Sequence, residues 1–170
     1  MRKLSVIPKK SFLNDQIFNL MQKSMPITCI DLVILKRGPN RTIEILLIKR
    51  SLKTEVGKWC NIGGRVIKNE RLAATIKRQA KRELGVSVAI IPPWRPNRPL
   101  CVMDDPKADP QKHSVTLVYP VTIKSGRLKD FGPEFSRVRW FSAKKLPSPI
   151  GFNHRQELKA VLEKIKNTPF

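Results

Sequence analysis

The feature that most constrains this chain is an amphipathic segment bracketed by glycines, GGRVIKNERLAATIKRQAKRELGV, at residues 63–86. Its apolar residues recur every three or four positions, as in a helix that buries one face; they are Leu72, Ala73, Ile76, Ala80 and Leu84. Asn69 is the expected N-cap, and Gly85 stands where a helix commonly needs a left-handed C-terminal residue. The segment therefore predicts a glycine turn, a short basic loop and one helix packed on a larger core.

Two polar side chains emerge at the rim of that apolar stripe. At roughly 100° per residue, Gln79 and Glu83 lie about 40° apart on the helix, and Arg82 lies further toward solvent. An amide and a carboxylate therefore emerge side by side near Gly63-Gly64. Glycines allow close backbone approach, so carbonyl or amide groups of this turn can meet a phosphate or a metal ion.

The spacing of this segment resembles the Nudix hydrolase signature. The residues that fit the signature are Gly64, Glu70, Arg78, Ala80, Glu83, Gly85 and Val86. Gln79 and Arg82 depart from it, because typical members carry metal-binding glutamates at both positions. The resemblance covers roughly residues 26–164, and its specific part is this segment.

The chain is also similar to the GDP-mannose mannosyl hydrolase branch, which lacks the same carboxylates and keeps the last one. The shared stretches are Pro26 to Asp31, Lys49-Arg50, Gly57 to Trp59 and Gly63 to Val66. This resemblance implies that Arg65 is a catalytic arginine, Glu83 a metal ligand and Asp31 a substrate contact.

The general-base histidine of that branch is missing here. The chain has Glu134-Phe135 before Trp140 instead. Glu134 is therefore a candidate metal ligand or general base, with a solvated surface charge as the equal alternative. His154 is expected near the cap of the last helix rather than as a catalyst.

The rest of the chain predicts strands, turns and a final helix. We expect strands at 27–35, 43–49, 86–91, 113–122 and 138–141, a hairpin turn at 124–127, a loop at 131–136 and a helix over about 153–166. The order predicts an α+β fold with a mixed sheet between helices, in agreement with the α/β/α sandwich of Nudix proteins. Residues 1–25 are expected to form an N-terminal extension, helical and packed on the domain, and residues 26–170 the Nudix hydrolase domain.

The net charge and the cysteine content indicate which ligands the protein favours and in which compartment it is expected. The chain of 170 residues carries 34 Lys and Arg against 13 Asp and Glu, a formal net charge of +21. Such an excess favours polyanions, which include phosphate ligands and RNA, although a solvated basic surface explains it equally well. The three cysteines are widely spaced and suggest no disulfide framework or zinc site, so we expect a cytoplasmic protein. No apolar run is long enough for a membrane span.

These residues lead to one expected reaction and one alternative. We expect a single Mg²⁺, with Mn²⁺ as a substitute, held by Glu83, Gln79 and the Gly63 carbonyl. Arg65 and Arg50 would grip a diphosphate, and Glu70 would pair with Arg78 or a loop amide. The expected activity is hydrolysis of a nucleoside diphosphate linked to a sugar or similar group. The alternative is an inactive Nudix-fold protein that binds nucleotides or RNA. The sequence does not determine which base or sugar is recognised, which bond is cleaved or whether the chain forms a homodimer.

Overall fold

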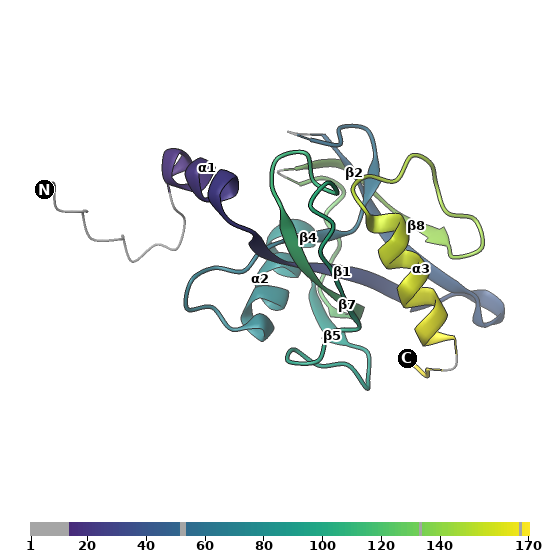
Figure 1. The fold of residues 1–170 in the computed structure, drawn as a ribbon. Coiled ribbons are helices and arrows are strands. Elements are labelled where there is room, and N and C mark those ends of the chain that lie inside the picture. The colour runs from purple at the N-terminus through teal and green to yellow at the C-terminus, as the bar shows by residue number, and fades with distance from the viewer. Residues whose placement is uncertain (1–13, 52–53, 133, 167) are drawn as a thin grey trace, which may run out of the picture.

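The computed structural model describes residues 14–51, 54–132, 134–166 and 168–170. These residues form an eight-stranded mixed sheet and three α-helices (Figure 1). The strands are β1 (Ile27–Arg37), β2 (Ile43–Arg50), β3 (Trp59–Cys60), β4 (Ile62–Arg65), β5 (Ser87–Ile90), β6 (Cys101–Met103), β7 (Ser114–Ser125) and β8 (Phe135–Ser142). The helices are α1 (Asp15–Ser24), α2 (Leu72–Leu84) and α3 (His154–Ile165), and a short 3₁₀ turn, η1 (Pro39–Arg41), joins β1 to β2.

The strand β1 is the centre of the sheet. It pairs antiparallel with β2 and β4 and parallel with β7. The outer strands complete the sheet: β3 and β8 pair with β2, and β5 and β6 pair with β7. β1 and β2 form a hairpin, and they correspond to the strands expected at 27–35 and 43–49. Residues 32–35 of β1 are all buried, as expected for a strand covered on both faces.

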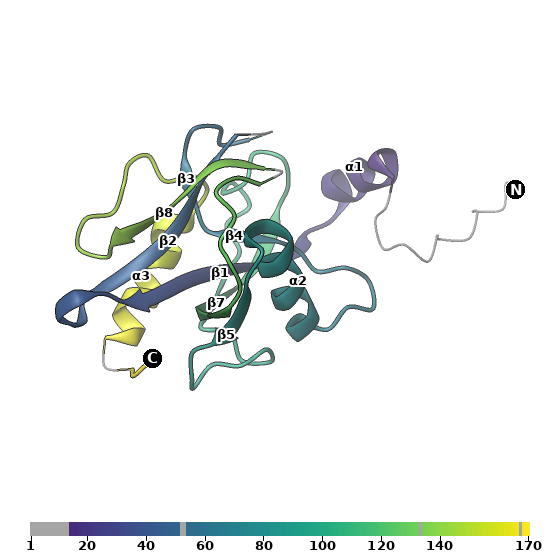
Figure 2. The ribbon, with the colours of Figure 1, turned by 180° about the vertical axis from the view of Figure 1, so that it is seen from behind.

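Two apolar layers lie on opposite faces of the sheet (Figures 1 and 2). On one face the buried side of α2 packs with Ile30, Leu32 and Tyr119. On the other face α3 packs with Val33 and Leu35, the neighbours that point the opposite way along β1. The predicted α/β/α sandwich with a mixed sheet is confirmed.

The C-terminal end of α2 is as predicted from the sequence, whereas the N-terminal end differs from the prediction. Gly85 follows the helix with φ 77°, in the left-handed conformation expected of it. Asn69 is not the N-cap, because the helix begins at Leu72 and Asn69 itself has φ 66° in the preceding turn. Glu70 ties the turn to the helix instead, accepting hydrogen bonds from the Thr75 hydroxyl at 2.8 Å and the Ile67 N–H at 3.4 Å.

Three other expectations are corrected. The expected glycine turn at Gly63-Gly64 is instead part of β4, which pairs with β1. Residues 124–127 do not form a hairpin turn, since β7 continues to Ser125 and the next strand, β8, pairs with β2. β8 does not pair with β7 because β1, β5 and β6 already flank it. The expected loop at 131–136 ends earlier, since β8 begins at Phe135. The short strand β6 was not expected from the sequence; it lies on β7 by backbone pairing, which leaves no periodicity over three residues.

The helix α1 projects from the sheet in Figure 1, and none of its residues is buried. Asn14 caps it, because the Asn14 side chain accepts a hydrogen bond from the Ile17 N–H at 2.9 Å. Residues 1–13, the first half of the expected extension, lie outside the described residues, so the division at residue 25 stays a prediction. Across the described ranges, no helix combines the length and the apolar character that crossing a bilayer requires.

Candidate functional site

A pocket of about 400 Å³ opens beside β4, within the size range of small-molecule sites. Its wall includes Gly63, Gly64 and Arg65 of β4, together with side chains from α1, α2, β1, the start of α3 and the loop before β7. Since β4 is short and pairs with β1, residues from both faces of the sheet reach this edge. The pocket therefore lies between the α2 layer and the α3 layer.

The two glycines let side chains of both layers approach the backbone. Gly63 is paired with Asp31, and a Cβ at Gly63 would overlap the Asp31 carboxylate and the Ile30 carbonyl. Gly64 has φ 152°, and a Cβ there would overlap the amide of Gln79. A carboxylate on one face and an amide on the other thus contact the glycine pair, which any larger residue would prevent.

The α2 side of the pocket contains two buried polar oxygen atoms. Gln79 Oε1 and Glu83 Oε2 have no hydrogen-bond partner among the described residues. Buried oxygens without a donor are costly, and carboxylate, amide and backbone oxygens are the ligands that Mg²⁺ prefers. The donor set present at this corner therefore fits one divalent cation.

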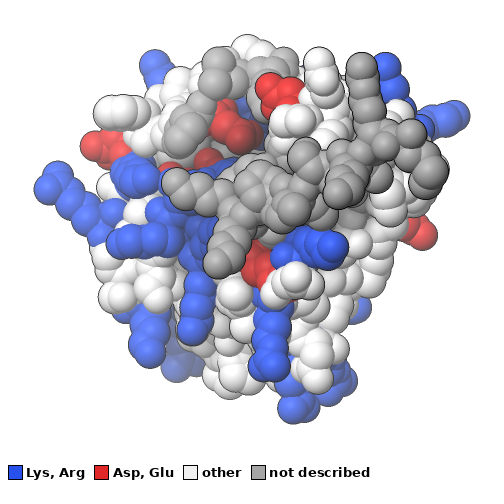
Figure 3. Space-filling model, turned by 90° about the vertical axis from the view of Figure 1, so that its left-hand side faces the viewer, with Lys and Arg blue, Asp and Glu red and all other residues white. Residues whose placement is uncertain are grey.

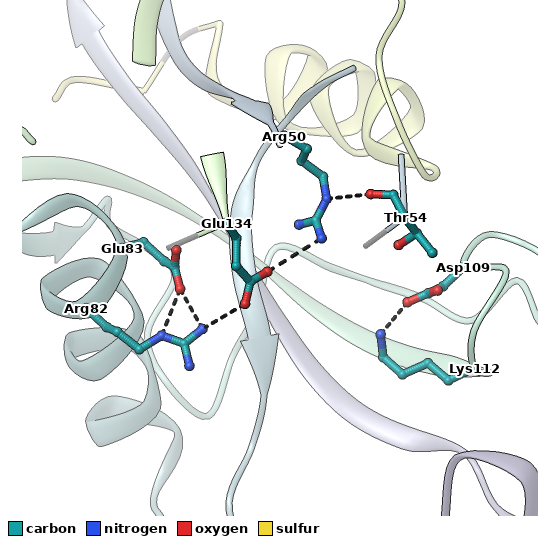
Figure 4. Close-up of polar contacts among 7 residues, drawn as sticks. All are labelled: Arg50, Thr54, Arg82, Glu83, Asp109, Lys112 and Glu134. Atoms are coloured by element: carbon teal, nitrogen blue, oxygen red, sulfur yellow. Dashed lines mark hydrogen bonds and ion pairs between the residues drawn. The ribbon is translucent and has the colours of Figure 1, made fainter. Parts of the chain in front are cut away.

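A chain of four charged side chains crosses the pocket beside that corner (Figure 4). Arg82 donates from Nε to Glu83 Oε1 at 2.8 Å, and its Nη2 lies 2.5 Å from the same oxygen. The same Nη2 lies 3.7 Å from Glu134 Oε1, while Arg50 Nη2 lies 3.5 Å from Glu134 Oε2. Arg50 is held in turn by Thr54, whose carbonyl accepts a hydrogen bond from its Nε at 2.9 Å. Glu134 is thus held between two guanidinium groups.

The pocket is rich in cationic groups. Arg65 projects over the ring of Phe18 in α1, with its guanidinium carbon 3.8 Å from the ring centroid. Burial, followed by the charges of neighbouring arginines such as Arg78, lowers the pKa of Arg65. Lys and Arg side chains also spread over the face shown in Figure 3, where acidic side chains are fewer. An anionic ligand would relieve the repulsion among these cations.

Glu70 and Arg78 form a structural pair, as expected from the sequence. Arg78 donates from Nε and Nη2 to the two oxygens of Glu70, both at 2.7 Å, and Nη2 also donates to the Arg65 carbonyl at 3.0 Å. The hydrogen bonds from Arg78 lower the pKa of Glu70 to about 2. The pair fixes the loop that carries Arg65 to α2, and both oxygens of Glu70 are already engaged.

A second polar cluster lies on the α3 side of the pocket. Asp31, His154 and Glu157 each place one potential ligand atom within 4.8 Å of the others, and Asn61 joins them. His154 Nδ1 accepts a hydrogen bond from the Asn61 N–H at 3.0 Å, so the proton of the neutral ring is on Nε2. That nitrogen lies 3.2 Å from Asp31 Oδ2. A protonated Nε2 cannot bind a metal ion, so the geometry favours a hydrogen-bonded network.

Burial controls the charge of this cluster. Burial raises the pKa of Asp31 to about 7, although a hydrogen bond with Glu157 acts in the opposite direction. Burial and then the charge of Asp31 raise the pKa of Glu157 to about 8. As a carboxylate, Glu157 Oε1 has no partner among the described residues, whereas as an acid it can donate to Asp31. The other oxygen, Oε2, accepts from Asn61 Nδ2 at 2.8 Å. Below a pH of about 8, Glu157 therefore keeps its proton and can donate it to Asp31.

Most of the residues expected at the site lie together at this pocket. The wall includes Asp31, Arg50, Gly63, Arg65, Gln79 and Glu134. Glu83 lies behind Arg82, with only 4% of its side chain exposed. Sequence reasoning missed the roles of Asn61, His154 and Glu157. Their signal was the spacing of His154 and Glu157 by one helical turn, which places both on one face of α3.

The chain matches the NUDIX domain family over residues 29–161, and it therefore belongs to the Nudix family. It is 28% identical over 134 residues to an ADP-ribose pyrophosphatase of Methanocaldococcus jannaschii, an alignment that covers 79% of this chain and 72% of that protein. It is 30% identical over 106 residues to the low-salt glycan biosynthesis protein Agl8 of Haloferax volcanii, covering 62% of this chain and 65% of that protein.

Solved structures agree with this assignment. A MutT NUDIX hydrolase from Burkholderia pseudomallei superimposes with a TM-score of 0.68 at 29% identity, over 81% of this chain and 98% of that chain. The NUDIX domain of Shewanella oneidensis NrtR, solved in complex with ADP ribose, gives a TM-score of 0.67 at 21% identity, over 95% and 96% of the two chains. At that lower identity the second likeness supports the fold alone.

Proposed function

We propose that this protein is a Mg²⁺-dependent hydrolase of a nucleoside diphosphate linked to another group, such as a sugar. Two relatives support the substrate class, since one is an ADP-ribose pyrophosphatase and the other is a glycan biosynthesis protein. ADP-ribose is such a compound, and glycan biosynthesis uses activated sugars. The observation that carries the proposal is the convergence at one glycine-lined pocket of cationic side chains and of buried oxygens that have no hydrogen-bond partner in the described part of the chain.

Each expected residue has a task in this proposal. Glu83, Gln79 and the Gly63 carbonyl would hold one Mg²⁺, for which Mn²⁺ could substitute. Such an ion neutralises a diphosphate and activates water. Arg65 and Arg50 would bind the diphosphate oxygens, for which planar guanidinium groups are suited.

Two carboxylates complete the proposed site. Asp31 would contact the substrate on the α3 side, where it lies at the pocket wall 3.2 Å from His154 Nε2. Glu134 would accept the proton of the attacking water, since it lies at the pocket beside Glu83 and 34% of its side chain is exposed. Arg65 would act in catalysis by stabilising the charge that develops on the diphosphate.

The test is turnover of ADP-ribose and a panel of nucleoside diphosphate sugars in Mg²⁺, with and without a chelator. We expect Glu83→Gln to reduce turnover by about 100-fold, because it removes the charged ligand and leaves the side-chain volume unchanged. The matched control is Glu163→Gln, which makes the same change on the exposed side of α3 and should retain full activity. Unchanged turnover by Glu83→Gln would show that the metal corner is misplaced.

The alternative function is a Nudix-fold protein without catalysis that binds nucleotides or RNA. The net charge of +21 and the replacement of two box carboxylates by Gln79 and Arg82 favour it. Binding of single-stranded RNA should be compared with heparin over a range of salt concentrations. A steep salt dependence shared by both ligands would indicate a general polycation effect, whereas selective RNA binding together with no turnover on the panel would favour the alternative.

A further inference from the structure

Arg82 occupies the space between two carboxylates. Its guanidinium contacts Glu83 Oε1 through Nε and Nη2 at 2.8 Å and 2.5 Å, and Nη2 lies 3.7 Å from Glu134 Oε1. Glu83 belongs to the last turn of α2, and Glu134 immediately precedes β8, so the contact links segments far apart in the sequence (Figure 4). Two acidic groups from separate elements are thus joined by one positive charge.

The surroundings of Glu83 indicate that this cation is exchangeable. Arg82 neutralises Oε1 but leaves Glu83 Oε2 and Gln79 Oε1 without partners among the described residues. A guanidinium is planar and its donors diverge, so it does not reach all of these oxygens at once. A small divalent cation accepts oxygens from several directions. The carboxylate is fixed and buried, whereas 39% of the Arg82 side chain is exposed, so the arginine is the member that can move.

We propose that the Arg82 guanidinium occupies the metal position on Glu83 until a divalent metal ion replaces it. The released guanidinium then binds the diphosphate of the ligand. This inference rests on the proposed function for the metal ion and the diphosphate. Without metal, Arg82 neutralises Glu83 and bridges it to Glu134. A metal ion on Glu83 would repel the guanidinium of Arg82. Because Arg82 already lines the pocket, the guanidinium can then donate hydrogen bonds to the phosphate oxygens of a bound ligand.

The exchange predicts a specific coupling between the two ligands. Metal alone binds weakly, because it must displace Arg82 without providing the arginine with a new partner. Diphosphate alone competes with Glu83 for the same guanidinium. When both bind, the metal ion replaces Arg82 as the partner of Glu83, and the diphosphate replaces Glu83 as the partner of Arg82. Each ligand therefore raises the affinity of the other by the same factor.

The test measures Mn²⁺ affinity from the signal of free Mn²⁺ in electron paramagnetic resonance, with and without α,β-methylene-ADP. This analogue carries a diphosphate whose bridge resists hydrolysis, so the measurement does not depend on activity. The variants are Arg82→Gln, which removes the cation, and Arg82→Lys, which keeps it. Lys77→Gln is the matched control, because it removes one positive charge from the exposed side of the same helix.

We expect Arg82→Gln to bind Mn²⁺ about tenfold more tightly than the wild type without the analogue, and to show a smaller gain when the analogue is added. Arg82→Lys and Lys77→Gln should remain within about threefold of the wild type. Equal Mn²⁺ affinity of Arg82→Gln and wild type would overturn the exchange while leaving the metal site intact. Tighter binding with an unchanged gain from the analogue would overturn the transfer to the diphosphate. Absence of Mn²⁺ binding in every variant would overturn both the exchange and the metal site. If the affinities are as expected but no substrate is turned over, only the hydrolase proposal is overturned.

Discussion

Replacement of Glu157 by glutamine should remove a large part of the pH dependence of folding stability. Glu157 is fully buried, and its pKa is raised from 4.5 to about 8, first by burial and then by the charge of Asp31. Between these two values the folded protein keeps the proton that the unfolded chain has released. Stability therefore falls as the pH rises through this window.

The magnitude follows from the proton count. One proton held only in the folded state changes the free energy of unfolding by about 1.4 kcal/mol per pH unit. Between pH 5.5 and 7.5 this would amount to about 2.7 kcal/mol, and incomplete titration at both ends reduces it to about 2.5 kcal/mol. Glutamine is isosteric and uncharged, and its amide can donate to Asp31 while its carbonyl accepts from Asn61. The variant should therefore fold and lack this contribution.

The assay is urea unfolding of the wild type and Glu157→Gln at pH 5.5, 6.5 and 7.5. The stability of the wild type should fall more steeply than that of the variant, by about 2.5 kcal/mol over the range. Glu163→Gln on the exposed side of α3 serves as the control and should have the slope of the wild type. Parallel slopes for all three proteins would refute the claim that Glu157 is protonated in the folded state.

Two further substitutions test the packing around the pocket. Gly63→Ala should destabilise the protein by about 3 kcal/mol in urea unfolding, because its Cβ would overlap the Ile30 carbonyl, which is backbone and cannot rotate away. Gly57→Ala should cost only about 1 kcal/mol, because Gly57 has φ 79° but open space around a Cβ; similar costs for both would argue against the close approach at Gly63. Arg78→Ala should cost about 2 kcal/mol at pH 7. This deficit should shrink as the pH falls from 4.5 toward 2, since Glu70 has a pKa of about 2 when paired and about 4.5 when unfolded; a constant deficit would contradict the pairing.

The sequence predicted those parts of the molecule that depend on local pattern. The apolar stripe of α2 and the glycine at its end were visible because a helix repeats its environment every three to four residues. The strands expected at 27–35 and 43–49 were visible for the same kind of reason. The Glu70 and Arg78 pair was also expected, since both residues belong to the segment that carries the family resemblance.

The parts that the sequence did not predict depend on tertiary contacts. Asn69 was expected as the N-cap, but the loop turns through it and Glu70 makes the stabilising bonds. His154 looked like a cap residue because nothing in its own helix shows that Asn61 and Asp31 lie opposite it. The position of Arg82 between two carboxylates depends on Glu134, which is 52 residues further along the chain and reaches α2 only once β8 has paired with β2.

We propose above all that this pocket cleaves a diphosphate compound with the help of a divalent cation. A ³¹P NMR time course of ADP-ribose and related nucleoside diphosphate sugars in Mg²⁺ tests that claim most directly. We predict that the diphosphate resonances of at least one compound are replaced by those of products, and that chelation of the metal or Glu83→Gln prevents the change. Diphosphate resonances that persist in every compound with Mg²⁺ or Mn²⁺ present, while the protein still binds them, would contradict it.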